Sequence, residues 1–284
     1  MSYIIALEIG GTNCRVALVN TSYQIDAIHV VDTIVGDKEA FLEQVAQAIL
    51  RFEHHFPTVL ALSMGVPGRV DSKEEIAILP NIKIRDVPLK AYLTKRFHKP
   101  VFIRNDAVMA ALAEANLGYG KSFSSTYFMT ISTGIGGAFV RDHQLAFSSE
   151  EIGHMMIPYQ HNWMELEQRG SGTGIVKLAA EHGLSIDSSK SFWQLVAQQR
   201  PETKPVYDTW LSIMKQTLTF IDRYFQPDVY VFSGGVVRNE AYFFQDFKAL
   251  FPHRRLALAQ LGQDAGILGA AYLGFSLTLS PQAI

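Results

Sequence analysis

One carboxylate stands where an α/β sheet would present it for chemistry. The segment 102–106, Phe-Ile-Arg-Asn-Asp, is a mostly apolar run that stops on the amide of Asn105 and the carboxylate of Asp106, and an alanine-rich segment follows at 107–117. Ligands of α/β folds bind at the carboxyl ends of strands, where such a carboxylate can accept a proton from a substrate. An Asp before a helix is also a common helix cap, and capping alone would explain an isolated Asp106. A catalytic role therefore depends on what surrounds it.

Two glycine turns of similar composition occur before and after this carboxylate. Residues 10–12 read Gly-Gly-Thr and residues 133–137 read Thr-Gly-Ile-Gly-Gly, and each turn lies between two β-type segments. Consecutive backbone N–H groups with no Cβ in the way can bind an anion, and the Thr hydroxyl can join them. One such turn alone is more often an ordinary hairpin. Two of them, on either side of a strand-end Asp, predict a nucleoside triphosphate held in a cleft between duplicated lobes.

Acidic and imidazole side chains gather after the second glycine turn, at Glu151, His154 and Glu167. Side chains of these kinds can hydrogen-bond the many hydroxyls of a sugar. A zinc site at His154 is a poor alternative, because zinc takes about four ligands and no Cys lies nearby. A solvated acidic turn at 150–151 is a further alternative, because paired charges usually lie on surfaces. A third glycine turn, Ser-Gly-Gly-Val at 233–236, follows an apolar segment and fits either a nearby base and ribose or a plain strand-to-helix turn.

Strands and helices are expected to alternate around these residues. The hydrophobic patterns predict strands at 3–7, 14–20, 24–35, 59–64, 102–106, 126–132, 138–140 and 228–232, and helices at 37–56, 89–97, 207–225 and 264–275. The first glycine turn leads into a strand, which argues against a GxGxxG dinucleotide fold. Because strand, glycine turn and strand recur after residue 118, a mixed α/β chain of two domains is predicted.

Composition narrows the classes of partner. The single cysteine, Cys14, excludes an intramolecular disulfide framework and suits a reducing compartment. A net charge of −2 gives no basic footprint for nucleic acid and no polybasic membrane patch. The first residues lack a signal-peptide pattern, and glycine, serine and proline interrupt the long uncharged segment 265–284. We expect a cytoplasmic protein whose partner is a small molecule or a second copy of itself.

Taken together, the motifs resemble the ROK family of sugar kinases and related repressors, within the actin-like, hexokinase-type ATPase fold. Beyond the motifs above, the resemblance rests on Gly-Val-Pro-Gly-Arg-Val-Asp at 65–71, Pro-Asn at 80–81 and Ser-Gly at 171–172, and it covers nearly the whole chain. It implies an α/β fold of two ribonuclease H-like lobes with a cleft between them. The lobes would be residues 1–118 and 119–284, with the last helix, about 266–284, packing back on the first lobe.

The resemblance also implies a role for each motif. The phosphate loops would be Gly10, Gly11, Thr12, Thr133 and Gly134, and the adenosine would lie by Gly234 and Gly235. Asp106 would be the catalytic base, and sugar hydroxyls would be bound by Asn81, Asn105, Asp106, Glu151, His154 and Glu167. The implied activity is transfer of the γ-phosphate of ATP, with Mg²⁺, to a primary hydroxyl of a hexose, N-acetylhexosamine or β-glucoside. The implied assembly is a homodimer that binds neither nucleic acid nor membrane.

Two departures from the family pattern bear on this expectation. The family's cysteine-rich zinc segment is replaced by residues 158–164, which contain no cysteine, so no zinc site is expected. Relatives without zinc include kinases resembling β-glucoside kinase, so glucose, fructose, N-acetylmannosamine and β-glucosides all stay open as substrates. The second departure is Glu8, where the family usually has Asp; its extra methylene shifts the carboxylate that would orient hydrated Mg²⁺.

The sequence leaves three classes of function: a kinase, a sugar-binding regulator and a structural ATPase. The repressor branch carries a DNA-binding domain before the first phosphate loop, whereas here that loop begins at Gly10, which favours a kinase. Glu8 keeps a non-catalytic sugar-binding regulator as the main alternative. A structural actin-like ATPase would leave Glu151, His154 and Glu167 without a role.

Overall fold

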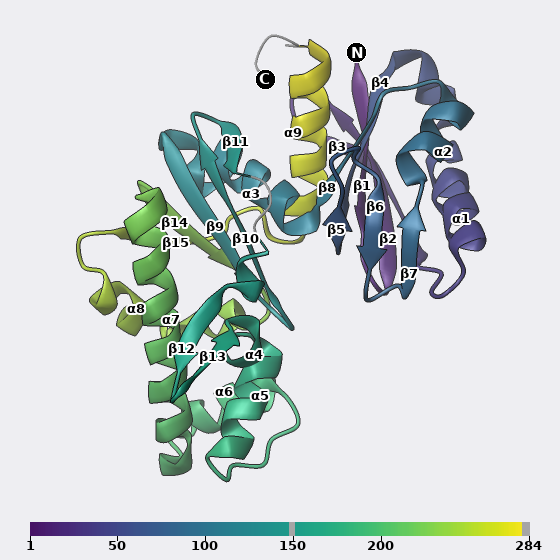
Figure 1. Cartoon of the computed structure of the whole chain (residues 1–284). Helices are drawn as coiled ribbons and strands as arrows, with labels where there is room; N and C mark the ends of the chain where they lie inside the picture. Colours follow the sequence, from purple (N-terminus) through teal and green to yellow (C-terminus); the bar gives the residue numbers. More distant parts are fainter. Residues whose placement is uncertain (148–150, 280–284) are drawn as a thin grey trace. The chain divides into compact units, whose positions relative to one another are not determined.

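The computed structural model describes residues 1–147 and 151–279 (Figure 1). The chain divides into two compact α/β units. Unit 1 comprises Met1–Ala113 and the C-terminal segment from Gln263, and unit 2 comprises Glu114–Gly262.

Unit 1 is built on a five-stranded sheet of order β3-β2-β1-β4-β8. Its strands are β1 (Tyr3–Ile9), β2 (Asn13–Asn20), β3 (Ile25–Asp32), β4 (Val59–Val66) and β8 (Val101–Asn105). The first three strands are antiparallel neighbours, while β1, β4 and β8 run parallel. The carboxyl ends of β1, β4 and β8 therefore lie at one edge of the sheet, which is where ligands of α/β folds bind.

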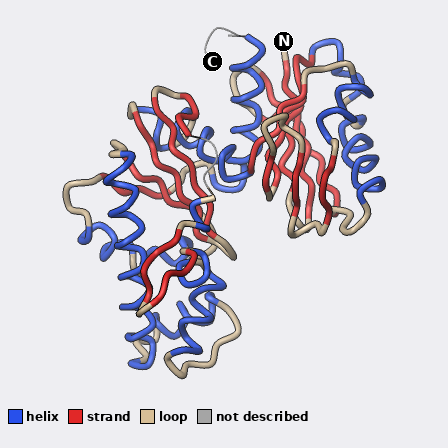
Figure 2. The backbone as a smooth tube through the Cα atoms, in the orientation of Figure 1, coloured by secondary structure: helices blue, strands red, loops and turns tan. Residues whose placement is uncertain are grey.

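Helices cover both faces of this sheet (Figure 2). They are α1 (Lys38–Leu50), α2 (Leu89–Phe97), α3 (Asp106–Asn116), which runs on into unit 2, α9 (Ala265–Leu279) and the short 3₁₀ helix η1 (Glu53–Thr58). Asp37 caps α1 by accepting a hydrogen bond from the Ala40 N–H at 2.9 Å, and Phe41, Val45 and Ile49 bury its apolar face. On the opposite face, α9 packs on β1 and β4. A small antiparallel sheet, β5 (Arg69–Val70), β6 (Ile76–Leu79) and β7 (Ile84–Val87), completes the unit.

Unit 2 repeats this architecture. Its sheet has the order β11-β10-β9-β14-β15, formed by β9 (Ser125–Ile131), β10 (Ile135–Arg141), β11 (Gln144–Phe147), β14 (Val229–Ser233) and β15 (Arg255–Leu258). Again the first three strands are antiparallel, and β9, β14 and β15 run parallel. Both units thus place a glycine turn between their first two strands.

The rest of unit 2 consists of helices and one β hairpin. The helices are α4 (Glu167–Gly170), α5 (Gly172–Glu181), α6 (Ser189–Ala197), α7 (Lys204–Phe225), α8 (Phe244–Leu250) and the 3₁₀ helices η2 (Tyr119–Ser122), η3 (Ile152–His154), η4 (Pro201–Thr203), η5 (Val237–Tyr242) and η6 (Gly262–Asp264), the last of which continues into unit 1. Strands β12 (Met156–Tyr159) and β13 (Asn162–Glu165) form the hairpin. Trp193, Trp210 and Phe247 are fully buried and form the aromatic centre of the core. Each unit therefore has its own hydrophobic core.

Two sequence expectations concern the C-terminal segment and membrane-spanning helices. Helix α9 is described to Leu279, so the end of the expected helix at 280–284 lies outside them. Within residues 1–147 and 151–279, no helix combines the length and the apolar composition needed to cross a bilayer.

Candidate active site

In unit 1 the first glycine turn contacts Asn81. The Gly10 N–H donates to the Asn13 carbonyl oxygen at 2.8 Å and closes the turn between β1 and β2. A Cβ added to Gly11 would lie 3.0 Å from the Cβ of Asn81, so the two positions are in contact. Because larger side chains would push this neighbour away, glycine is what permits the close approach. The structure thus brings together an expected phosphate loop and an expected sugar-binding amide.

Asp106 lies at the junction of β8 and α3. One of its carboxylate oxygens accepts a hydrogen bond from the Ala107 N–H at 2.8 Å, and Asn105 Oδ1 accepts from the same N–H at 2.9 Å. The amide nitrogen of Asn105 donates to the Gly68 carbonyl oxygen at 3.2 Å. A Cβ added to Gly65 on β4 would lie 3.3 Å from the Asp106 Cα. Asp106 is therefore the first residue of α3, half-buried at the carboxyl edge of the sheet, and the side chain of Asn105 rather than that of Asp106 is at the N-cap position.

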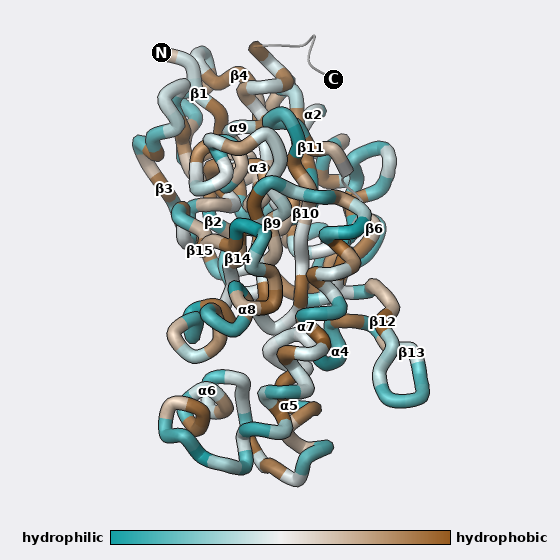
Figure 3. The backbone as a smooth tube through the Cα atoms, turned by 90° about the vertical axis from the view of Figure 1, so that its left-hand side faces the viewer, coloured by the Kyte–Doolittle hydropathy of each residue, from teal (hydrophilic) through white to brown (hydrophobic). Residues whose placement is uncertain are grey.

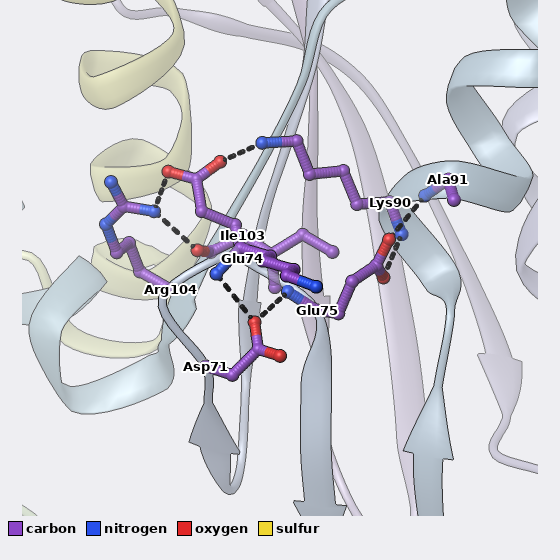
Figure 4. Close-up of polar contacts among 8 residues, drawn as sticks. Asp71, Glu74, Glu75, Lys90, Ala91, Ile103 and Arg104 are labelled. Carbon is purple, nitrogen blue, oxygen red and sulfur yellow. Dashed lines mark hydrogen bonds and ion pairs between the residues drawn. The ribbon is translucent and has the colours of Figure 1, made fainter.

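An acidic loop between β5 and β6 holds this edge in place. Glu74 accepts hydrogen bonds from Arg104 at the end of β8 and from the Lys90 ammonium, the latter at 2.5 Å (Figure 4). Glu75 accepts from the Lys90 N–H at 3.0 Å, and Asp71 accepts from the Glu75 N–H at 2.9 Å. The residue directly before Asn105 and Asp106 is thus fixed by ion pairs. The sequence analysis missed Glu74, because a glutamate in a surface loop carries no motif.

Glu8 takes part in a second ion-pair network. Arg15 on β2 contacts Glu8 Oε2 at 2.8 Å and Asp264 Oδ1 at 2.6 Å. Burial raises the pKa of the Glu8 carboxyl, although the charge of Arg15 opposes the rise. The Glu8 side chain is 31% exposed. Glu8 is therefore held by a guanidinium and is only partly open to solvent.

In unit 2 the second and third glycine turns lie side by side. The Val236 N–H donates to the Ile131 carbonyl oxygen at 3.0 Å, which joins the turn after β14 to the end of β9. Gly234 has a φ of +105°, and a Cβ there would lie 2.3 Å from the Ile131 oxygen. Only glycine fits this position without strain. These turns border a pocket of about 600 Å³ lined by Ser132, Thr133, Gly172, Thr173, Val176, Asp187, Ser188, Ser189, Lys190, Gly235, Val236, Arg238 and Asn239.

The volume of this pocket is within the range of small-ligand sites, roughly 300–1,000 Å³. The Asn239 amide nitrogen donates to the carbonyl oxygens of Gly235 at 3.4 Å and Val236 at 3.2 Å, which fixes that side chain. The Thr173 hydroxyl donates to the Thr133 carbonyl oxygen at 2.9 Å. The pocket thus unites Thr133 and Gly235, two residues of expected phosphate and adenosine loops, with side chains of 187–190 that the sequence did not single out.

Glu167 connects the second glycine turn to the expected sugar-binding group. Its Oε2 accepts a hydrogen bond from the Ile135 N–H at 2.8 Å, and a Cβ added to Gly134 would lie 2.3 Å from the same oxygen. A Cβ added to Gly153 would lie 3.1 Å from it as well. Glu167 therefore lies between the turn and the 3₁₀ helix that ends on His154.

His154 forms an ion pair that the sequence did not predict. Its Nδ1 lies 3.2 Å from Glu165 Oε2 at the end of β13, and both side chains are partly exposed. The hydrogen bond to Glu165 raises the pKa of His154, and the charges of Glu151 and Glu167 act in the same direction. Within residues 1–147 and 151–279, no group of three or more His, Cys, Asp or Glu side chains is arranged to bind a metal ion.

The expected site residues therefore form two groups. Glu8, Gly10, Gly11, Thr12, Asn81, Asn105 and Asp106 belong to unit 1, and Thr133, Gly134, Glu151, His154, Glu167, Gly234 and Gly235 belong to unit 2. Each group contains a glycine turn in contact with a side chain able to hydrogen-bond a sugar hydroxyl.

The duplicated strand order, with a glycine turn after the first strand of each unit, is the actin-like ATPase fold that the sequence predicted. The chain matches the ROK family profile over residues 4–275 and belongs to that family. Membership confirms the family resemblance that the motifs carried.

The relatives of this chain include enzymes and a regulator. It is 27% identical over 288 residues to the bifunctional enzyme NanE/NanK of Brucella melitensis, which matches 96% of this chain and 54% of that protein. The chain thus spans about half the length of this relative. It is 32% identical over 144 residues to the xylose repressor of Bacillus spizizenii, a match of 45% of this chain and 38% of that protein.

Solved structures agree with the fold. The ROK hexokinase from Thermus thermophilus superposes with a TM-score of 0.84 at 28% identity, over 95% of this chain and 98% of that one. A ROK family glucokinase from Streptomyces griseus in complex with glucose and AMPPNP superposes with a TM-score of 0.74 at 25% identity, over 96% and 99% of the two chains.

Proposed function

We propose that the protein is an ATP-dependent sugar kinase that transfers the γ-phosphate to a primary sugar hydroxyl, with Asp106 as general base. One observation carries the proposal: in each unit a phosphate-type glycine turn contacts a side chain suited to sugar hydroxyls. Gly11 contacts Asn81 in unit 1, and Gly134 contacts Glu167 in unit 2. The similarity to a glucokinase in complex with glucose and AMPPNP supports the same pair of ligands.

In the proposed reaction, Asp106 accepts the proton of the attacking hydroxyl, and that oxygen forms the new bond to the γ-phosphorus. The bond from this phosphorus to the β–γ bridging oxygen breaks, and its electron pair leaves on ADP. A positioned base typically contributes about 10² to 10⁴ in rate. Asn81, Asn105, Glu151, His154 and Glu167 would orient the other hydroxyls, since phosphoryl transfer depends mainly on positioning and charge neutralisation.

The backbone N–H groups of residues 10–12 and 133–134 would bind the phosphates of ATP, and the pocket beside Gly235 would bind the nucleoside. Mg²⁺ would neutralise phosphate charge when bound, with Glu8 and Asp264 oriented by Arg15 to contact its water shell. We also expect the enzyme to act as a cytoplasmic homodimer that binds neither nucleic acid nor membrane.

A coupled ADP-release assay over hexoses, N-acetylhexosamines and β-glucosides tests the function. The expected result is ADP release that requires one class of sugar and Mg²⁺. ADP release that is independent of every sugar would contradict it. Asp208→Asn is the matched control for Asp106→Asn. Asp208 is an exposed acid paired with Lys204 on α7, outside both groups of expected site residues.

The second candidate is a non-catalytic sugar-binding regulator. The pairing of Glu8 with Arg15 favours it, because a carboxylate engaged by a guanidinium is less available to a hydrated metal ion. The similarity to a xylose repressor over 45% of the chain is in keeping with it. Calorimetry distinguishes the two: a regulator binds sugar with no turnover when ATP and Mg²⁺ are added.

A further inference from the structure

The β12–β13 hairpin carries an exposed apolar face. Met156 pairs with Glu165 and Pro158 with Trp163 across the hairpin. Alternate residues of a strand share a face, so these four side chains lie together. Ile157 and Met164 point to the other face and are buried at 3% and 9% exposure, whereas Trp163 is 68% exposed. The outer face is thus an apolar surface that ends on a carboxylate.

Trp163 differs from the other tryptophans of the chain. The sequence has three, and Trp193 and Trp210 are fully buried in the core of unit 2. An exposed large aromatic side chain that lies beside polar site residues is a common mark of a binding surface. Met156, at 51% exposure, extends the same surface.

This surface is continuous with the expected sugar-binding group. Glu165 lies on the same face as Trp163 and contacts His154 at 3.2 Å. Two residues along a strand span roughly 7 Å, so the indole lies about one sugar ring beyond the Glu165–His154 pair. A hexose bound at His154 would leave Trp163 uncovered, and a second ring attached to it would reach the indole.

We propose that Trp163 stacks on the second ring of the acceptor, so that the substrate is a disaccharide or an aryl or alkyl glycoside. The C–H-rich face of a pyranose is positively polarised and packs on the negative face of an indole. The flexible thioether of Met156 can adapt to the edge of that ring. This subsite rests on the proposed sugar kinase function and narrows its substrate class.

A second copy of the chain is the competing occupant. The surface consists of Met156, Pro158 and Trp163, whereas a stable interface involves about 20–30 residues a side. The tip of the hairpin is hydrophilic and extends away from the helices of unit 2 (Figure 3). Continuity with His154 and Glu165 favours the sugar.

Tryptophan fluorescence without ATP tests the subsite directly, because Trp163 is the exposed one of the three. Glucose and N-acetylmannosamine serve as one-ring probes, and cellobiose and phenyl β-glucoside as two-ring probes. Two-ring probes should shift the emission of the wild-type protein to shorter wavelength. Because the variants lack this fluorophore, calorimetry measures their affinities: two-ring probes should bind about 10-fold more weakly to Trp163→Ala, with one-ring binding unchanged within about two-fold. Trp163→Phe should retain most of the affinity. Tyr224→Ala is the matched control, because Tyr224 is an aromatic side chain of similar exposure, 67%, and lies on α7 rather than on the hairpin.

The outcomes separate the subsite from the kinase function. If Trp163→Ala weakens one-ring and two-ring probes equally, or changes neither, the subsite is wrong even where sugar-dependent ADP release persists. If Trp163→Ala instead converts a dimer to a monomer in sedimentation without any change in sugar binding, the second copy is the occupant and the subsite is wrong. If two-ring probes bind through Trp163 but are never phosphorylated, the subsite stands and the kinase function fails.

Discussion

The two units share one topology but differ at the end of their fifth strand. In unit 1, β8 ends on Asn105 and leads directly into Asp106, whereas in unit 2 the equivalent strand, β15, ends on Leu258 and is followed by Ala259. In unit 2 the distinctive turn instead follows β14, where Gly234 has a positive φ that favours glycine. The duplication therefore supplies the glycine turn twice, while the proposed proton acceptor is in unit 1 and the pocket proposed for the nucleoside is in unit 2.

The largest expected effect follows from this asymmetry. Asp106→Asn should lower kcat about 10²- to 10⁴-fold, because the amide cannot accept the hydroxyl proton. The fold should be preserved, since an amide oxygen can still accept the hydrogen bond from the Ala107 N–H. Sugar-dependent ADP release and thermal unfolding measure the two quantities. Turnover within a few-fold of wild type would remove Asp106 from the chemistry.

The next largest effect is a loss of stability on substituting Gly234, in the turn after β14 of unit 2. Gly234→Ala combines a positive φ with a clash against the Ile131 oxygen, so it should lower the free energy of unfolding by about 2–3 kcal/mol. Gly36→Ala is the matched control: its φ is +82°, but a Cβ there meets nothing within 4 Å. It should cost about 1 kcal/mol from strain alone. Equal costs in urea unfolding would show that the contact between the turns does not matter.

Local patterns predicted the shared features of the two units well. Alternating apolar residues and the Gly-Thr turns located β1, β2, β9 and β10, and the transition from β8 to α3 was visible at Asp106. These signals are local because strand period and turn chemistry act over a few residues. The division into lobes near residue 118 came from the recurring strand, glycine turn and strand and from the family resemblance. It stays a prediction, as do the roles of the site residues.

What distinguishes the units could not be predicted in this way. Asp264 meets Arg15 across 249 residues of sequence, and Glu74 meets Arg104 across 30. Such pairings depend on which strands become neighbours, which no short window records. The Glu165–His154 pair is close in sequence, but the β12–β13 hairpin that forms it has no sequence motif of its own.

The Arg15 network gives a third prediction, specific to unit 1. Arg15→Gln should lower the free energy of unfolding by about 1–2 kcal/mol near neutral pH, because it leaves Glu8 and Asp264 without their shared cation. The pKa of Glu8 is already raised by burial, so its contribution is favourable below its unfolded pKa and is lost as pH rises through the folded value. The variant should therefore lose more stability than wild type between acidic and neutral pH. Denaturant unfolding at several pH values measures this, and parallel curves for the two proteins would contradict it.

The smallest expected change in stability comes from the more exposed of two ion pairs, one beside each expected sugar-binding group. Glu74 and Arg104 in unit 1 are 19% and 28% exposed, whereas Glu165 and His154 in unit 2 are 39% and 60% exposed. Glu165→Gln should lower the pKa of His154 toward its ordinary value, because the hydrogen bond to Glu165 is the main cause of the rise. The stability that this pair contributes is present below the pKa of His154 in the unfolded chain and is lost as pH rises through its pKa in the folded protein. The free energy of unfolding of Glu165→Gln should therefore be lower than that of wild type by less than about 1 kcal/mol at mildly acidic pH, and equal to it at alkaline pH.

NMR titration of the His154 ring and urea unfolding at both pH values test the difference, with Glu202→Gln, which removes the exposed partner of Arg200, as control. An unchanged His154 titration would mean that Glu151 and Glu167, rather than the hairpin, set its protonation. The hairpin of unit 2 would then be held by the packing of Ile157 and Met164 and by the hydrogen bond from the Tyr159 hydroxyl to Glu181, without a contribution from His154.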